Sequence, residues 1–297
     1  MIRGVQAAAI LAAAFAVTGT GALASARPTA CDRACLSGIA DAFLDALVSR
    51  QAARAPLGRR PKVTENAVDE APGKGLWRSL DATPSRLLVA DPVSGQVASF
   101  GTVRRQGRLA AMMLRLKVVA RRVTEVEMLV GGGTDGPYAA AANLLHPDVL
   151  YDAPVPASRR SSRQELVRVA NSYFTALERH DGSLARFSER CDRYEAGARV
   201  TNNTRMIGAP DGGVFTCAES LEAAMGVKVE VTERRFPIVD PDRGIVVAID
   251  FLEPHRADGS ASSLYLAAVF KIVDGRIRQL DEINTPVTPG ARTGFAP

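Results

Sequence analysis

Histidine is scarce in this sequence, and its scarcity disfavours several classes of active site. Only His146, His180 and His255 occur among 297 residues, each isolated from the others. A zinc site needs histidine and cysteine at ligand spacings, so we predict no bound metal. The nucleophile motif Gly-x-Ser-x-Gly is absent, and three scattered histidines do not assemble a catalytic triad.

Aromatic residues and clustered positive charge are also in short supply. Aromatics make up 5% of the chain, so we expect a core of small aliphatic side chains. The net charge is +5, but the arginine pairs are scattered and no aromatics interleave with them. Nucleic-acid binding calls for a basic cluster, so we predict no nucleic-acid partner. The "GGG" at 131–133 lacks the Gly-Lys-Ser/Thr ending of a phosphate loop, and we predict no cofactor.

The only long apolar run lies at the start of the chain. Arg3 precedes an apolar stretch over 7–17, and Ala24-Ser25-Ala26 then forms a small-x-small cleavage site. The stretch is shorter than the roughly 20 residues that a stable membrane anchor needs. We therefore predict a signal peptide over residues 1–26, no membrane anchor, and a secreted or periplasmic protein.

Four cysteines in an exported chain allow three disulfide pairings. Cys191 and Cys217 lie within one predicted domain, and Cys31 and Cys35 remain near the mature start. We favour the pairing 191–217 with 31–35. Cysteine nucleophiles are then disfavoured, because all four thiols are oxidised.

The chain also contains an internal repeat. Residues 36–50 match residues 166–180 at an offset of 130, with apolar positions on one face of an amphipathic helix. The same offset carries Glu65 onto Glu195. Residues 87–103 then match 236–252 at an offset of 149, and 114–129 match 269–283 at about 154.

These later stretches alternate in polarity and are rich in Val, Ile and Leu, which predicts antiparallel strands. Each repeat therefore predicts an α+β unit with N-terminal helices packed on one face of a curved antiparallel sheet. We predict one domain over 31–130 and a second over 163–290. Between them, residues 131–162 are rich in Gly, Pro, Ala and Ser, which is typical of a linker.

The stretch "NSYFTALERHDGSLARFSERCDRYEAG" resembles the start of nuclear transport factor 2-like (NTF2-like) proteins, the superfamily of ketosteroid isomerases and SnoaL-like cyclases. The closing "AVFKIVDGRIRQLDEIN" resembles their last strand pair. The resemblance covers 163–285 and, more weakly, 32–130. It implies two tandem NTF2-like cone domains that pair as an internal pseudo-dimer, as in secreted two-copy members.

The resemblance also implies site residues. In the isomerases a helix tyrosine and an acid at a strand start point into one conical pocket, and these positions fall on Tyr173 and Glu195. Tyr173 would donate to an oxyanion, and Glu195 would be the base. A further acid of the family falls near Ala268, which departs from the pattern. In the first copy the corresponding residues are Phe43 and Glu65.

Five further residues are candidates for ligand binding, each with a structural alternative: Asn202, Asn203, Asp250, Trp77 and Glu65. The two asparagines suit left-handed turns as well as polar ligands. Asp250 lies within an apolar strand and faces either the cavity or solvent. Trp77 is the only tryptophan and fits a core as well as a pocket. Glu195 itself fits an ion pair with Arg193 or Arg199.

The functional prediction is a cofactor-free isomerase, lyase or hydratase acting on a small hydrophobic molecule by general acid–base chemistry. The alternative is a non-catalytic module of the cell envelope that binds a small ligand or another protein. Fold does not decide between them.

Overall fold

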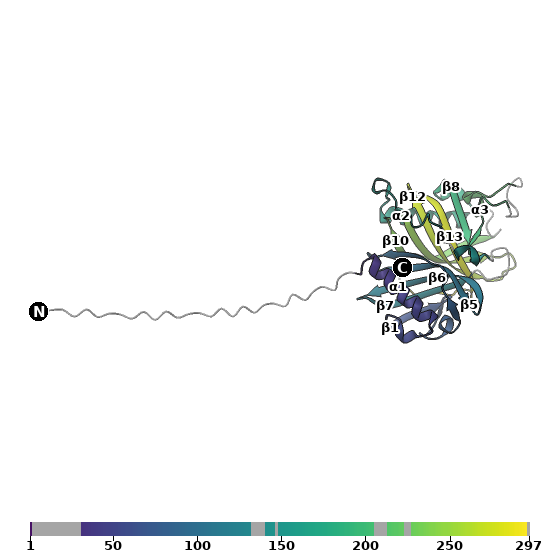
Figure 1. Ribbon diagram of the computed structural model, residues 1–297. Coiled ribbons are helices and arrows are strands. Elements are labelled where there is room, and N and C mark those ends of the chain that lie inside the picture. The colour runs from purple at the N-terminus through teal and green to yellow at the C-terminus, as the bar shows by residue number, and fades with distance from the viewer. Residues whose placement is uncertain (2–30, 132–139, 146–147, 205–212, 223–226, 296–297) are drawn as a thin grey trace.

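The computed structural model describes residues 1, 31–131, 140–145, 148–204, 213–222 and 227–295, which form two units (Figure 1). The predicted signal peptide, apart from Met1, lies outside the described residues. In the first unit a helix, α1 (Arg33–Val48), precedes η1 (Ala52–Arg54), β1 (Leu57–Glu65), β2 (Val68–Asp69), η2 (Gly75–Arg78), β3 (Leu80–Ala82), β4 (Leu87–Asp91), β5 (Gln96–Arg105), β6 (Arg108–Val119) and β7 (Arg122–Gly131).

The second unit repeats this order. After η3 (Ala141–Leu145) and η4 (Ala157–Arg159) come α2 (Arg163–Arg179), η5 (Gly182–Leu184), β8 (Phe187–Glu195), β9 (Ala198–Arg199), α3 (Cys217–Glu222), β10 (Lys228–Asp240), β11 (Ile245–His255), β12 (Ser263–Val273) and β13 (Arg276–Val287). Among the described residues the sheet orders are β2-β1-β7-β6-β5-β3, with β4 on β5, and β10-β11-β12-β13-β8-β9. The strands pair antiparallel except for one parallel pair in each unit, β1 with β7 and β8 with β13.

The two helices form where the repeat predicted them, and local chemistry sets the ends of α2. Its N-cap Ser162 accepts from the backbone N–H of Glu165, and its C-cap His180 adopts the left-handed conformation. Apolar residues at helical spacing are buried against the sheet, among them Leu166, Tyr173 and Leu177. Each helix therefore covers one face of its own sheet.

The other faces of the two sheets pack against each other, as the stacked units in Figure 1 show. Strand β11 illustrates the arrangement. Its Val246, Ala248 and Leu252 belong to the core under α2, whereas Val247 and Ile249 belong to the core between the sheets. Because both faces of the strand are buried, its sequence is apolar nearly throughout.

Two equivalent ion pairs tie the units together. Arg33 at the start of α1 binds Asp240 of the second unit through two hydrogen bonds of 2.5 and 2.8 Å. Arg163 at the start of α2 binds Asp91 of the first unit at 2.5 and 3.0 Å. These residues are related by the repeat offsets of 130 and 149. The contact is therefore reciprocal, as in a two-fold dimer, and the two units are in contact as an internal pair.

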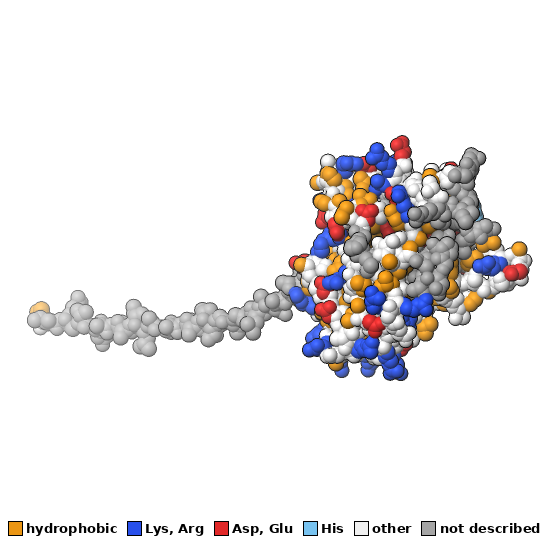
Figure 2. Space-filling model, turned by 45° about the vertical axis from the view of Figure 1, so that its right-hand side comes forward, with side chains coloured by type: hydrophobic (Ala, Val, Ile, Leu, Met, Phe, Trp, Pro, Cys, Tyr) orange, Lys and Arg blue, Asp and Glu red, His pale blue; other side chains and the backbone are white. Residues whose placement is uncertain are grey.

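Both disulfides have the predicted pairing, Cys31 with Cys35 and Cys191 with Cys217. The described part of the predicted linker packs closely: Tyr151 and Val155 are buried, and Tyr151 joins the core between the sheets. In the described part of the chain no helix is both long and apolar enough to cross a membrane. Lysine and arginine side chains are dispersed over both units on the face in Figure 2.

Candidate active site

The parallel pair β8–β13 places polar side chains beneath α2. Cross-strand register sets Glu195 opposite Glu282 and Arg193 opposite Leu280. Leu280 belongs to the core under the helix, so its neighbour Arg193 faces the same interior, as does Glu282 two residues further along its strand. Tyr173 of α2 reaches this interior from the other side. We call the space between α2 and the sheet the second cone, and its counterpart under α1 the first cone.

A hydrogen-bond network joins these side chains. The hydroxyl of Tyr173 donates to Glu282 Oε1 at 2.7 Å, and Arg193 Nε lies 3.0 Å from both the Tyr173 oxygen and Glu282 Oε2. Arg193 Nη2 reaches Glu282 Oε2 at 2.9 Å and also pairs with Glu195. Arg193 therefore bridges two carboxylates, and Glu282 is held by donors on both of its oxygens.

Burial dominates the electrostatics of this network. The side chains of Glu282 and Arg193 are 1% and 9% exposed, whereas that of Glu195 retains 19%. Desolvation raises the pKa of Glu282, and the Glu195 charge raises it further, while Arg193 opposes both. Desolvation likewise raises the pKa of Tyr173 well above its ordinary value, so its hydroxyl stays protonated. The cluster reaches the surface at its Glu195 end.

Asp250 on β11 lies on the same face of the sheet. It is fully buried, and within the described part of the chain neither carboxyl oxygen has a hydrogen-bond partner. Desolvation, with a smaller contribution from the Glu282 charge, raises its pKa well above the ordinary value. A buried carboxyl in this state holds its proton and is able to give it up, which is the property of a general acid.

The first cone shows what the fold requires at the same positions. Strand register gives the counterparts of the two buried acids. Glu282 lies opposite Ala268, and at the same place in the first unit Met128 lies opposite Leu114. Asp250 lies opposite Leu266, and at the same place in the first unit Gly101 lies opposite Met112. The position of Tyr173 is taken in the first cone by Phe43, and that of Arg193 by Val63, both buried. The equivalent sets are thus Phe43, Val63, Gly101 and Met128 in the first cone and Tyr173, Arg193, Asp250 and Glu282 in the second.

This internal comparison argues that the charges do not serve folding. The first cone folds with apolar residues or glycine at all four positions, so the architecture has no need of ionisable groups there. A buried ion pair rarely gains over well-packed apolar residues, and an unpaired buried carboxyl costs stability. The second cone also has the small Ala268 where the first cone has the larger Leu114. The second cone therefore holds costly polar groups beside small residues, which makes it the candidate site.

Comparison with known proteins finds a partial match to one family model and similarity to several solved structures. A family model described as a domain of unknown function (DUF8021) matches residues 159–284. No curated protein matches significantly. An M. tuberculosis LEH-like epoxide hydrolase is 19% identical, over 41% of this chain and 84% of that chain, with a TM-score of 0.33. AusH from Aspergillus nidulans is 15% identical, over 44% and 90%, with a TM-score of 0.32.

A third structure, a protein of unknown function with cystatin-like fold from Methylobium petroleophilum PM1, is 16% identical over 46% of this chain and 85% of that chain, with a TM-score of 0.30. In each unit of the present chain a helix leads through a 3-10 turn into a strand, and the last strand returns parallel to that first strand. Helices packed on one face of a curved sheet are what the sequence resemblance implies, whereas the parallel pair in each unit was not predicted. Both units have the NTF2-like fold.

The NTF2-like cone of the second unit brings together three of the predicted site residues. Tyr173 and Asp250 lie fully inside it, and Glu195 lies at its edge. Glu195 forms the ion pair with Arg193 that was its structural alternative. Arg193 and Glu282 were not among the predicted site residues, although they form the centre of the network.

The first-cone candidates have structural surroundings. Glu65 Oε2 accepts from the backbone N–H of Leu76 at 2.6 Å and so holds the η2 turn that carries Trp77. Trp77 is buried and packs edge-on against Phe43, with ring centroids 5.4 Å apart. In the first cone, therefore, Glu65, the counterpart of Glu195, anchors the turn whose large ring fills the interior.

The two asparagines lie outside the network. Asn202 has a φ of 48° and donates to the Cys191 carbonyl at 3.0 Å. Asn203 donates to the Arg199 carbonyl at 2.6 Å. Both contacts shape the turn after β9. Part of the following loop, residues 205–212, lies outside the described residues. In the described part of the chain no group of three His, Cys, Asp or Glu side chains is arranged to hold a metal ion.

Proposed function

We propose that the second unit is a cofactor-independent enzyme that uses general acid–base chemistry on a small, largely apolar molecule, as an isomerase, lyase or hydratase. The observation that carries this proposal is the difference between the two cones. Tyr173, Arg193, Asp250 and Glu282 are buried in the second cone, where the first cone has Phe43, Val63, Gly101 and Met128.

Asp250 is the proton donor in this proposal. Its raised pKa keeps the carboxyl neutral, and it has no competing partner among the described residues. A neutral acid in an apolar interior donates to an oxygen that gains negative charge during the reaction. The matching observation in the first cone is Gly101, which leaves no acid at that position.

Glu282 is the proton acceptor. Tyr173 and Arg193 hold its carboxylate in one orientation, and burial raises its pKa towards the range of a working base. The acid and the base lie on strands separated only by β12. Two strand spacings are roughly 10 Å, and small Ala248 and Ala268 lie opposite each other in the same region. In this proposal the substrate binds between the two carboxyls.

Glu195 has a supporting role in this scheme. It pairs with Arg193 at the more exposed end of the cluster, so it orients the guanidinium that holds Glu282. In an isomerisation Glu282 removes a proton from one carbon while Asp250 protonates the carbonyl oxygen; Glu282 then returns the proton to another carbon as the enol hydroxyl gives its proton back to Asp250. In the hydrolysis of an epoxide Glu282 takes a proton from water as the water oxygen bonds to one ring carbon, and Asp250 protonates the ring oxygen as its bond to that carbon breaks.

A panel of three compounds tests the proposal: styrene oxide for hydration, a β-hydroxyketone for dehydration and a β,γ-unsaturated ketone for isomerisation. We expect turnover of at least one compound. Glu282→Gln and Asp250→Asn should each lower the rate by about 100-fold or more, the usual contribution of a general base or acid. Glu189→Gln, an equal charge change at an exposed position of β8, is the matched control.

Two results would refute the proposed enzymatic function. Turnover that survives Glu282→Gln unchanged removes the assigned base. Binding of the compounds in a thermal-shift assay without turnover by any variant supports the passive binding module instead.

We also propose that the protein is exported, with residues 1–26 removed. The basic start, apolar run and small-x-small site support this assignment, and two disulfides fit an oxidising compartment. Intact mass of protein isolated from the envelope or medium should correspond to a chain that begins at Arg27 with all four cysteines oxidised. Retention of residues 1–26 in a cytoplasmic product would contradict it.

A further inference from the structure

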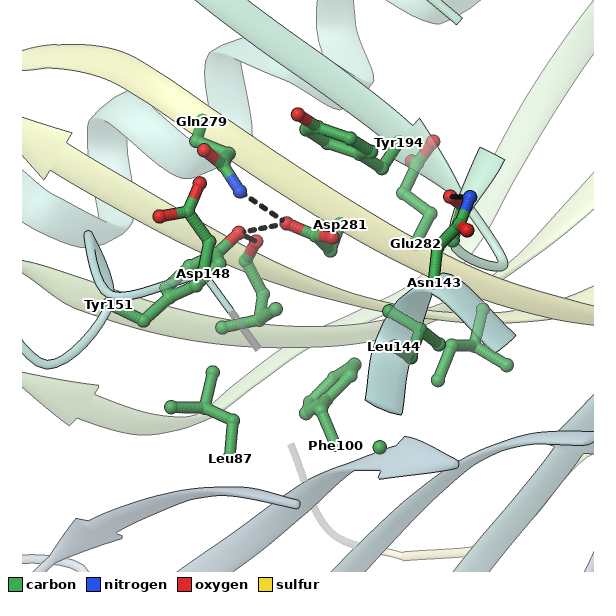
Figure 3. Close-up of a pocket in the computed structure, with 14 residues that line it drawn as sticks. Leu87, Phe100, Asn143, Leu144, Asp148, Tyr151, Tyr194, Gln279, Asp281 and Glu282 are labelled. Carbon is green, nitrogen blue, oxygen red and sulfur yellow. Dashed lines mark hydrogen bonds between the residues drawn. The ribbon is translucent and has the colours of Figure 1, made fainter. Parts of the chain in front are cut away.

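A cavity of about 280 Å³ lies between the two NTF2-like units and is bordered on one side by Glu282 of the second-cone network (Figure 3). We call it the inter-unit cavity. Its walls come from three parts of the chain: Leu87 and Phe100 of the first unit, Leu144 and Tyr151 of the connecting segment, and Asp281 of β13. Because β13 alternates, Asp281 faces this cavity while its neighbour Glu282 faces the second cone.

One wall of the inter-unit cavity is polar and the opposite wall is apolar. Figure 3 shows the Asp281 carboxylate between Tyr151 and Gln279, with Leu87, Phe100 and Leu144 across from it. Asp281 Oδ2 accepts from the Tyr151 hydroxyl and from Gln279 Nε2, the latter at 3.1 Å. No lysine or arginine of the described residues pairs with Asp281, so its negative charge is left unmatched in the cavity.

The two-fold relation between the units supplies a direct comparison. The repeat offset of 154 makes Glu127 of β7 the counterpart of Asp281, and it too faces the other unit. Glu127 is fully buried and neutralised by two arginines: Arg115 Nε lies 2.5 Å from Oε2, and Arg235 Nη2 lies 2.5 Å from Oε1. The Tyr265 hydroxyl donates to Glu127 as that of Tyr151 donates to Asp281.

The site around Glu127, which we call the twin site, is also covered by an aromatic ring. Phe295 stacks on the guanidinium of Arg115, whose Cζ lies 4.6 Å from the ring centroid, and Lys62 Nζ lies 4.5 Å from the same centroid. The chain therefore fills this site with cationic groups and an aromatic ring of its own.

Around Asp281 the equivalent groups are missing or turned away. The offset of 154 places Val269 where the first unit has Arg115. The counterpart of Arg235 at the offset of 149 is Arg86, which pairs with Asp41 instead. The same carboxylate–tyrosine arrangement thus remains, but the cation and the ring are absent from the described residues, and the inter-unit cavity occupies their place.

We infer that the inter-unit cavity is a binding site for a small molecule that carries a cationic amine or guanidine on an aromatic body. The cation pairs with Asp281 as Arg115 and Arg235 pair with Glu127, and the ring lies against Leu87, Phe100 and Leu144 as Phe295 lies over the twin site. The size, the unmatched carboxylate and the apolar wall all fit this class of ligand. The inference does not depend on the proposed enzyme activity.

Calorimetric titration of the purified full-length protein with three indole probes tests the site. Tryptamine is cationic, tryptophol is its neutral alcohol and indole-3-acetate is anionic. We expect one tryptamine site per chain, with affinity at least about tenfold above that for tryptophol and higher still relative to indole-3-acetate, because the charged group alone differs.

Two variants locate the binding. Asp281→Asn should weaken tryptamine about tenfold and leave tryptophol unchanged, and Leu144→Trp should block both by filling the apolar wall. Asp258→Asn, in an exposed loop, is the matched control and should change neither. Equal affinity for all three probes, or tryptamine affinity unchanged in Leu144→Trp, would overturn the inference. The second variant keeps the test decisive if Asp281→Asn loses stability with its Tyr151 hydrogen bond.

Acidification gives an independent readout. Burial, with the nearby Asp148 and Asp192 charges, raises the pKa of Asp281 to about 6. The groups that face it are Tyr151 and Asp148 of the connecting segment, Tyr194 and Asp192 of β8, and Gln279 of its own strand. Only about a tenth of Asp281 is then ionised at pH 5, so tryptamine should bind about tenfold more weakly at pH 5 than at pH 7. Tryptophol should bind equally at both, and a tryptamine affinity independent of pH would contradict the role of Asp281.

Discussion

Replacement of Asp250 by asparagine should stabilise the protein relative to the wild type, and the difference in unfolding free energy should grow as the pH rises. The side chain is fully buried without a partner among the described residues, and burial raises its pKa well above the ordinary value of 3.8. Above pH 3.8 the unfolded chain releases this proton while the folded protein keeps it. Unfolding then becomes easier by up to about 1.4 kcal/mol per pH unit in the wild type. The asparagine has nearly the same shape and no proton to release.

The magnitude follows from that linkage. With an unfolded pKa of 3.8, and Asp250 still protonated in the folded state, the wild type loses about 2.4 kcal/mol relative to Asp250→Asn between pH 4 and pH 6. The effect begins near the unfolded pKa and ends where pH passes the folded pKa.

Urea denaturation of both proteins at pH 4, 5 and 6, followed by circular dichroism, measures this difference directly. Asp69→Asn in the exposed strand β2 is the control for the loss of a carboxyl. A stability difference between wild type and Asp250→Asn that stays constant over this range would refute the reasoning, because Asp250 would then be ionised in the folded protein.

Three further predictions concern stability. Arg193→Val should destabilise the protein by about 3–5 kcal/mol at pH 7, since it leaves Glu282 buried without a cation. Urea denaturation at pH 4 should show a smaller loss of stability. An equal loss at both pH values would argue against a charge effect. Removal of the Cys191–Cys217 bridge by a double alanine variant should cost about 3.5 kcal/mol from the entropy of closing a loop of this length; a urea midpoint equal to that of the wild type would contradict the predicted constraint. Trp77→Ala should cost about 3–5 kcal/mol by opening a void in the first cone; a loss below 1 kcal/mol by the same assay would mean that Trp77 does not fill it.

Most of the fold could be predicted from the sequence, because the fold occurs twice in one chain. An amphipathic helix and a set of alternating strands each recurred at constant offsets, and the strand register reproduces these offsets residue by residue. The pairing of the units was less visible. Arg33 and Asp240 lie 207 residues apart, and no local pattern predicts that they meet. The packing of the connecting segment could not be predicted either, because its Gly- and Pro-rich composition does not indicate that Tyr151 is buried.

The candidate site was only half visible for a related reason. Tyr173 and Glu195 followed from the resemblance, and Asp250 attracted attention as a charge within an apolar strand. Arg193 and Glu282 lie in stretches with many charges, so neither was conspicuous. A sequence signal for both existed nevertheless. The offsets of 130 and 154 align them with Val63 and Met128, and a charge that replaces an apolar residue between two copies of one fold indicates a position under functional demand.

The side-chain partners were beyond reach from the sequence. Whether Glu195 pairs with Arg193 or Arg199 depends on which face of the sheet each arginine occupies. Arg193 of β8 pairs with Glu195, whereas Arg199 of β9 lies opposite Tyr194 and pairs with Asp192. The inter-unit cavity likewise depends on how two units dock, since its walls come from segments that are distant in the chain.

The measurement that tests the central claim most directly is the stability of a chain in which the four polar residues of the second cone are replaced by uncharged ones. The variant Tyr173→Phe/Arg193→Val/Asp250→Asn/Glu282→Met introduces the first-cone side chains at three positions and a neutral side chain of the same shape at Asp250. If those groups serve chemistry rather than folding, this variant will unfold cooperatively with a free energy equal to or above that of the wild type. A variant that does not fold, or that is less stable than Arg193→Val alone, would contradict the account.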